Sequence, residues 1–189
     1  MNPVFYIDTN VIRDCIKRRK TETIVAIDYI KENRWKCYTS IFALMEESDI
    51  EKDFNFFNKK VKQGMEINEI LRMRNSKDLG VENLDDSAEK IQEFIDQYEF
   101  VEIQNIVSDT SWNKAVTASK QSNISSSDII HLVTAGESKC DILLTSDEFF
   151  IKEGREFLNK IKEKTPIFCK PIKKEILSLI QQNPNQNTS

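Results

Sequence analysis

The sequence lacks any apolar run long enough to cross a membrane. Spanning a bilayer takes about 20 consecutive apolar residues, and the apolar runs of this 189-residue chain are much shorter. The N-terminus also lacks the basic segment and long apolar stretch of a leader peptide, because a strand-like run begins at Val4. We therefore expect a soluble cytoplasmic protein with no membrane partner.

Cysteine is scarce, and its four copies lack a metal-binding spacing. Cys15, Cys37, Cys140 and Cys169 form no CxxC pair and no Cys/His ligand pattern. Isolated cysteines of this kind are typical of proteins from a reducing compartment. We interpret them as buried free thiols and assign no zinc site.

An excess of positive charge is missing too. The net charge of -4 predicts no strong general attraction to nucleic acid. It leaves a nucleic-acid substrate open, since a local basic patch can coexist with an acidic active site that supplies several of the negative charges. The length and the 39% apolar content indicate one globular domain with its own core.

Short β-prone apolar runs alternate with helical segments along most of the chain. The expected strands are 4–7, 35–40, 100–103, 142–145 and 167–170. The expected helices begin near residue 10 and then cover 23–32, 41–50, 109–121, 125–136 and 171–180. This alternation predicts an α/β fold with a mainly parallel central sheet covered by helices on both faces.

The middle of the chain, residues 51–99, is highly charged and lacks strand-like sequence. Its apolar residues repeat at helical spacing, first Phe54, Phe57 and Val61 and later Ile91, Phe94, Ile95 and Tyr98. We predict a helical insertion or hairpin inside a single domain of residues 1–180. The first stripe suits either core packing or a dimer surface. The polar residues 181–189 are expected to form a disordered tail.

Two of the expected strands end at an aspartate. Asp8 follows the first strand and Asp147 the fourth, and carboxylates at the rim of a core are costly unless they are paired or bind a metal. The carboxyl ends of parallel strands gather at one edge of a sheet. Asp141 precedes the fourth strand and lies roughly 13 Å from that edge. We expect Asp8 and Asp147 to meet, without Asp141.

Two further carboxylates lie near the same edge. Asp128 begins an apolar helix after three serines, where it can cap the helix or, since that helix is apolar enough to be buried, face the strand ends. Either Glu46 or Glu47 follows the apolar run 41–45. Neighbouring helix residues point about 100° apart, so only one of the two is expected to face the site.

Carboxylates drawn together repel one another unless a cation compensates. Oxygen ligands without a His/Cys pattern favour Mg²⁺ or Mn²⁺ over zinc. One or two such ions can activate water and stabilise the leaving oxygen in phosphodiester cleavage. Thr9, Asn10, Thr145 and Ser146 can orient an acid or a water, or simply close the turns after the strands.

Taken together, these segments resemble the PIN-domain metal-dependent nucleases, especially the VapC-like toxins of bacterial and archaeal toxin–antitoxin pairs. The matching pieces are Ile7-Asp8-Thr9-Asn10-Val11, Ser40 followed by Glu46, Ser127-Asp128-Ile129-Ile130, Leu143-Leu144-Thr145-Ser146-Asp147 before Phe149, and Ile167-Phe168-Cys169-Lys170-Pro171. The resemblance covers both ends of the chain and leaves the middle unexplained.

The resemblance implies a three-layer α/β/α sandwich in which four acids gather around Mg²⁺ or Mn²⁺ and hydrolyse RNA. These acids are Asp8, Glu46, Asp128 and Asp147. Glu46 is preferred over Glu47 because its distance from Ser40 matches the family pattern. The resemblance also implies a partner antitoxin protein, and the first apolar stripe of the middle segment allows a homodimer.

Basic residues close to the expected site are few. Arg13 lies on the helix that leaves Asp8, and Arg18 and Arg19 belong to the densest basic run, 17–20. We predict that these arginines bind RNA phosphates, the simpler interpretation being a solvated helix end. His131, one turn after Asp128, could face the site, but we interpret it as a core histidine.

Two other functions fit part of the pattern. A noncatalytic RNA-binding or protein-interaction module would keep the same fold and would be indicated by acids that lie well apart. A phosphohydrolase of the haloacid-dehalogenase kind also has an aspartate after its first strand. Two residues after Asp8 this chain has Asn10 instead of a second acid, which argues against that chemistry.

Overall fold

The computed structural model describes residues 2–74, 82–105, 108–164 and 166–182. Its centre is a five-stranded sheet in the order β3-β2-β1-β4-β5, and every neighbouring pair is parallel. The strands are β1 (Val4–Ile7), β2 (Lys36–Ser40), β3 (Val101–Gln104), β4 (Ile142–Leu144) and β5 (Ile167–Cys169). Each lies within one residue of its predicted bounds.

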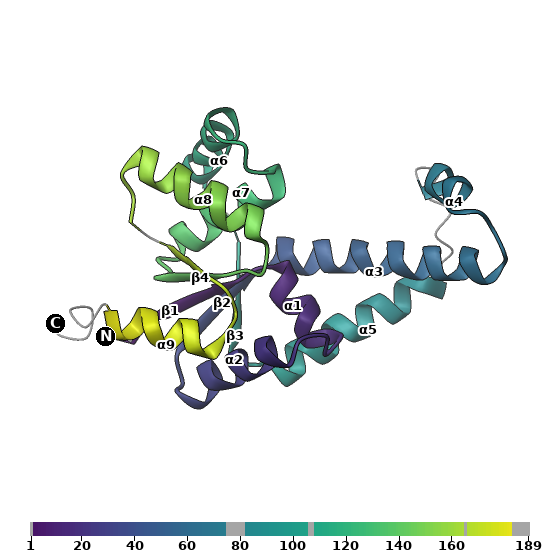
Figure 1. The fold of residues 1–189 in the computed structure, drawn as a ribbon, viewed down its shortest axis with the longest axis horizontal. Coiled ribbons are helices and arrows are strands. Elements are labelled where there is room, and N and C mark those ends of the chain that lie inside the picture. Colours follow the sequence, from purple (N-terminus) through teal and green to yellow (C-terminus); the bar gives the residue numbers. More distant parts are fainter. Residues whose placement is uncertain (1, 75–81, 106–107, 165, 183–189) are drawn as a thin grey trace.

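Helices cover both faces of this sheet. In the described residues they are α1 (Thr9–Ile16), α2 (Thr21–Glu32), α3 (Ile41–Lys62), α4 (Ile67–Arg74), α5 (Glu82–Gln97), α6 (Asp109–Gln121), α7 (Ser126–Glu137), α8 (Glu148–Ile161) and α9 (Lys173–Gln182). One face packs against α1, α2, α5 and α9, and the other against α6, α7 and α8 (Figure 1). The α/β fold, a three-layer α/β/α sandwich, is therefore as predicted.

The strands are buried on both faces, which explains their continuous apolar sequence. Successive side chains of a strand point to opposite faces. On β1, Phe5 and Ile7 join the core beneath α1 and α2, whereas Tyr6 joins the core beneath α7 and α8. On the neighbouring strand β4, Leu143 shares the side of Tyr6. The sheet thus separates two hydrophobic cores.

All four cysteines are free and buried, as predicted. Cys15, Cys37 and Cys169 lie in the core beneath α1 and α2, and Cys140 lies in the opposite one. Burial raises the pKa of each thiol above its usual value. The four side chains therefore stay protonated and act as small hydrophobic groups.

The middle of the chain forms a helical hairpin. Helix α3 continues to Lys62, so the predicted end of this helix near Ile50 is wrong. Helix α5 packs beside α3, and α4 lies at the far end, away from the sandwich (Figure 1). The base of the hairpin belongs to the core, because Phe94 and Tyr98 of α5 are buried there. Residues 75–81 of the predicted insertion lie outside the described residues.

The apolar stripe predicted on α3 faces solvent in part. Phe54 and Val61 are each 54% exposed, whereas their neighbour Phe56 is buried. Core packing, one of the two interpretations of the stripe, is therefore wrong for Phe54 and Val61. The reason is that packing against α5 and α1 sets which side of α3 turns inward.

The C-terminal helix is slightly longer than the sequence predicted. Helix α9 ends at Gln182, so Gln181 and Gln182 belong to a helix and not to the predicted disordered tail. The rest of that tail, 183–189, lies outside the described residues. Across the described ranges, no helix combines the length and apolar character needed to span a membrane.

Candidate functional site

A cavity of about 420 Å³ opens at the carboxyl ends of β1 and β4, and we call it the acidic pocket. All four acids expected from the sequence line it. Its lining residues are Asp8, Thr9, Asn10, Arg13, Glu46, Ile50, Ser125, Ser127, Asp128, His131, Asp147 and Phe149. The acids come from separate parts of the chain, namely the ends of β1 and β4, helix α3 and the first turn of α7.

Asp8 occupies the most buried position among the four acids. It directly follows β1, and its backbone N–H donates to the carbonyl of Leu144 on β4 at 3.2 Å. Its Oδ1 caps α1 by accepting from the N–H of Val11 at 3.1 Å. Burial raises the pKa of Asp8 to about 6, although His131 and a hydrogen bond from Thr145 act in the opposite direction.

Asp147 lines the same pocket as Asp8, because β1 and β4 are neighbouring parallel strands. It caps α8, with Oδ1 accepting from the N–H of Phe150 at 2.9 Å. Its own backbone N–H donates to the hydroxyl of Thr145 at 3.0 Å. The buried Thr145 therefore bonds to both aspartates and supports the site from behind the pocket lining. Ser146, also predicted as supporting, is outside the lining.

Asp128 is held at the N-terminus of α7. The hydroxyl of Ser125 accepts from the Asp128 backbone N–H at 3.2 Å and donates to its Oδ2 at 2.7 Å. Burial raises the pKa of Asp128, and repulsion from Asp147 and Glu46 raises it further. The cap of α7 is therefore Ser125 and not Asp128, whose carboxylate lines the acidic pocket from the first turn of the helix.

The structure separates the two neighbouring glutamates of α3. Glu46 lines the pocket, where its Oε2 accepts from Thr9 Oγ1 at 2.5 Å and lies 3.1 Å from His131 Nε2. Burial favours its neutral form, but the hydrogen bonds from His131 and Thr9 outweigh burial and lower its pKa. Glu47 is fully buried outside the lining and pairs with Arg13 at 2.9 Å. Burial raises its pKa to about 7.

Asp141 is far from the pocket, as predicted from the direction of β4. Its Oδ2 accepts a hydrogen bond from the backbone N–H of Val4 at 2.8 Å. Val4 is the first residue of β1, so Asp141 lies at the opposite edge of the sheet. This aspartate supports strand pairing and gives a matched control for changes at Asp8.

The predicted phosphate-binding arginines differ in position. Arg13 lines the pocket, but its Nε is paired with Glu47. Arg19 pairs with the buried Asp14 at 2.6 Å. Arg18 and Arg19 follow the C-terminal end of α1, whose eight residues extend about 12 Å from Asp8. The structure therefore brings only Arg13 of the three to the acidic pocket.

For His131 the sequence left two positions open, the core or the site, and the structure combines them, whereas the serine loop was missed. His131 is buried with both ring nitrogens in hydrogen bonds, as a core histidine should be, yet it also lines the pocket. Ser125 and Ser127 line the pocket as well. Their position three residues or fewer before Asp128 was the available signal. The hydrogen-bond partners of His131 are distant in the sequence, so no local pattern predicted them.

The acids supply the type of ligand that a divalent cation prefers, although their side chains are not drawn together around one point. Across the described ranges, no three His, Cys, Asp or Glu side chains are grouped closely enough to hold a metal ion. Asp8 and Asp147 are turned toward the helices that they cap. The donors are nevertheless all oxygen, and the negative charge of Asp128 raises the pKa of Asp8. A divalent cation would relieve this repulsion.

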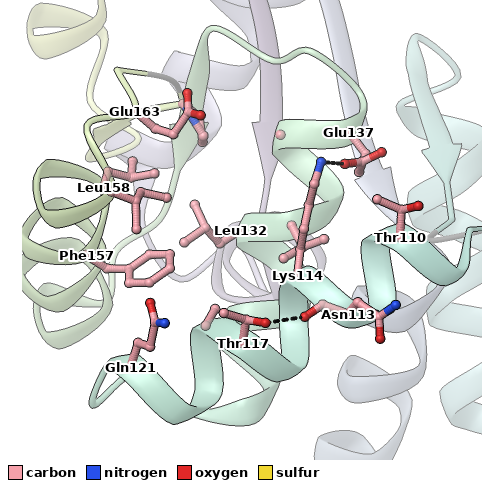
Figure 2. A pocket seen from close by; sticks show the side chains of 15 residues that line it. Thr110, Asn113, Lys114, Thr117, Gln121, Leu132, Glu137, Phe157, Leu158 and Glu163 are labelled. Carbon is pink, nitrogen blue, oxygen red and sulfur yellow. Dashed lines mark hydrogen bonds and ion pairs between the residues drawn. The ribbon is translucent and has the colours of Figure 1, made fainter.

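A larger cavity, about 530 Å³, lies between α6, α7 and α8 and shares no lining residue with the acidic pocket. Figure 2 shows Leu132, Phe157 and Leu158 around its apolar interior. An ion pair between Lys114 and Glu137, 2.5 Å long, lies along it. None of the acids proposed from the sequence lines this cavity, so it is not the site that the sequence predicted.

Comparison with known proteins adds no family assignment. No protein-family model matches the chain, and no curated protein matches it.

Proposed function

We propose that this protein is a Mg²⁺- or Mn²⁺-dependent endoribonuclease that hydrolyses RNA phosphodiester bonds in the acidic pocket, as a PIN-domain toxin of a toxin–antitoxin pair. One observation carries the proposal: Asp8, Glu46, Asp128 and Asp147 converge on a single pocket. Perturbed carboxyl groups gathered in a cleft are characteristic of functional sites. Here burial raises the pKa of Asp8 to about 6.

The four acids and Thr145 have distinct roles in this proposal. Asp8, Asp128 and Asp147 would hold the cation, with Glu46 completing the acidic wall. A bound divalent ion supplies Lewis acidity to the scissile phosphate and makes the attacking water more acidic. Thr145 keeps Asp8 and Asp147 in place through its two hydrogen bonds.

The substrate would enter past an exposed aromatic ring. Phe149 lines the pocket and is 54% exposed. Single-stranded RNA is commonly bound by stacking unpaired bases on such rings. Arg13 is the cationic side chain in the lining, although it also pairs with Glu47. We expect bases at Phe149 and phosphates toward the acids.

A protein partner is also part of the proposal. Phe54 and Val61 on α3 and Ile67 and Leu71 on α4 are exposed apolar residues of the helical hairpin. Large exposed apolar patches commonly mark interaction surfaces. We propose that an antitoxin or a second copy of the chain covers them.

A noncatalytic RNA-binding or protein-interaction module is the second candidate. It is favoured by the finding that, among the described residues, no acids are grouped closely enough to hold a metal. The capping bonds of Asp8 and Asp147 also give these acids a structural purpose. The two candidates differ in one property, which is metal-dependent cleavage.

Removing the metal tests this difference. The protein is incubated with single-stranded RNA in Mg²⁺ or Mn²⁺, and again after a chelator has been added in excess. We expect the chelator to slow cleavage about 100-fold or more, since a catalytic metal supplies several kcal/mol of transition-state stabilisation. Restoring the metal should restore the rate, which is followed on a gel with end-labelled RNA.

Two outcomes would reject the enzyme. Cleavage that continues undiminished in chelator would remove the metal from the account. Binding of RNA without cleavage at any metal concentration would favour the noncatalytic module.

A further inference from the structure

A second hollow opens beside the acidic pocket, at the carboxyl ends of β2 and β3. It measures about 320 Å³ and is lined by residues of α3, α6 and α7. Ser40, the last residue of β2, and Asn105, which directly follows β3, also line it. We call it the apolar hollow. It therefore lies at the same edge of the sheet as the acids.

The walls of the apolar hollow carry large apolar side chains that solvent reaches. Ile41 and Met45, one turn apart on α3, are 52% and 61% exposed, and Trp112 on α6 is 52% exposed. Ile130 of α7 contributes a further apolar wall. None of the described residues in this lining is charged. Such a hollow suits a neutral group with an apolar face, and not a phosphate.

Two aromatic rings in contact separate the apolar hollow from the acidic pocket. Phe42 lines the hollow, His131 lines the pocket, and their ring centroids are 5.5 Å apart. On α3, Met45 faces the hollow and the next residue, Glu46, faces the pocket. On α7, Ile130 and His131 divide in the same way. A molecule held at the acids therefore has the hollow within reach of its adjoining group.

The order of the strands places the apolar hollow to one side of the acids. The sheet runs β3-β2-β1-β4, with Asp8 after β1 and Asp147 after β4. Neighbouring strands are about 4.8 Å apart, so the ends of β2 and β3 lie roughly 5–10 Å from the end of β1. Phe149 comes from the β4 side of the acidic pocket. An RNA strand laid along this edge would meet the hollow on one side of the acids.

We propose that the apolar hollow binds an unpaired nucleobase of the RNA, stacked on Trp112, next to the nucleotide whose phosphate lies at the acids. Unpaired bases commonly stack on aromatic rings, and polar side chains bond to their edges. The amide of Asn105 both donates and accepts, as such an edge requires. The identity of the ligand rests on the proposed nuclease function. The hollow would then select which nucleotide stands at the acidic pocket.

The fluorescence of Trp112 reports directly on this site. The chain's other tryptophan, Trp35, precedes β2 at the opposite edge of the sheet, where it contacts the rings of Phe5 and Tyr29. A short single-stranded RNA is titrated in Mg²⁺ into Asp8→Asn protein, in which cleavage is expected to be slow. We expect saturable quenching that Trp35→Phe preserves and Trp112→Phe abolishes. RNA that binds without quenching Trp112 would overturn the proposal.

Substitutions at Trp112 distinguish stacking from general apolar contact. Trp112→Leu keeps an apolar side chain but removes the ring, and we expect RNA binding about 5–150-fold weaker, the usual contribution of one stacked base. Trp112→Phe keeps a ring and should retain most of the affinity. Val116→Ala is the matched control, since Val116 is 49% exposed on the same helix but outside the lining. Affinity is measured by the fluorescence anisotropy of end-labelled RNA.

Two results would reject the base site. One is a Trp112→Leu protein that binds RNA as tightly as Trp112→Phe. The other is a Trp112→Leu protein with unchanged RNA affinity and altered subunit assembly, which would assign the apolar hollow to a protein partner.

These binding measurements need no cleavage, so they separate this proposal from the nuclease. Weaker binding by Trp112→Leu, in a protein whose wild type never cleaves RNA, would support the base site and reject the nuclease. Unchanged binding by Trp112→Leu in an active enzyme would reject the base site and leave the nuclease standing. Should Trp112→Leu fail to fold, the quenching titration still decides.

Discussion

Replacing Asp8 by Asn is expected to lower metal-dependent RNA cleavage by more than about 100-fold, because outer-shell changes alone cost 10–100-fold and Asp8 would touch the metal itself. The substitution removes a negative charge while keeping the size of the side chain. The new Asn can still cap α1 through the N–H of Val11, since Asn is as good a cap as Asp. Loss of activity would therefore report on the charge and not on the fold. Initial rates with end-labelled RNA give the measurement.

The same change at Asp141 provides the matched control. Asp141 flanks β4 at its other end and accepts a hydrogen bond from Val4, which an Asn oxygen can also accept. We expect Asp141→Asn to cleave at close to the wild-type rate. Equal losses in both variants, or full activity in Asp8→Asn, would show that the acidic pocket is not the catalytic site.

Asp8→Asn is also expected to stabilise the fold at neutral pH by roughly 1–3 kcal/mol. Burial raises the pKa of Asp8 to about 6 from its usual value of 3.8. A pKa that is higher in the folded state means a stabilising contribution that is complete below pH about 4 and lost as the pH rises through about 6. Near pH 7 the wild-type protein therefore carries a buried charge at a cost, and Asn removes it.

Denaturant unfolding at two pH values measures this effect. The free energy of unfolding of Asp8→Asn should exceed that of the wild type near pH 7.5, and the gain should shrink toward pH 4. Adding Mn²⁺ near pH 7.5 should narrow the gap by stabilising the wild type alone, since a ligand stabilises the state that binds it. A variant that is less stable at both pH values would mean that the capping bond of Asp8 depends on its charge.

Much of the fold follows from local sequence. The apolar runs of β1 and β4 mark strands buried on both faces, and their parallel pairing brings Asp8 and Asp147 together. The same rule separates Asp141, which lies at the opposite edge. Helix geometry allows only one of two adjacent glutamates to face the pocket, and in the structure this residue is Glu46.

Other features depend on contacts that no local pattern carries. The inward side of α3 is set by packing against α1 and α5, which buries Phe56 and exposes Phe54. The sequence shows an apolar stripe but not its orientation. The partner of His131 on β1 is Tyr6, a residue 125 positions away. The basic run after α1 likewise looked available for RNA until the structure paired Arg19 with Asp14.

The acids of the pocket have two purposes that oppose each other. Asp8 and Asp147 cap the helices that follow β1 and β4, a stabilising role that asparagine could also fill. A carboxylate caps a helix about as well as an asparagine amide does. Capping alone therefore does not explain why an ionisable group is buried at Asp8, beside Asp128. In the proposed metal site these charges bind the cation at a cost in folding stability. The activity of Asp8→Asn is therefore expected to fall while its stability rises.

The most direct test of the proposed metal site is to locate Mn²⁺ in crystals of the wild-type protein by its anomalous scattering. We expect a peak in the acidic pocket, bonded to carboxylate oxygens of Asp8, Asp128 or Asp147, with water completing its coordination. The capping bond of at least one of these aspartates should then be loosened or broken. A pocket without Mn²⁺, in a protein that cleaves RNA only when Mn²⁺ is present, would contradict the account.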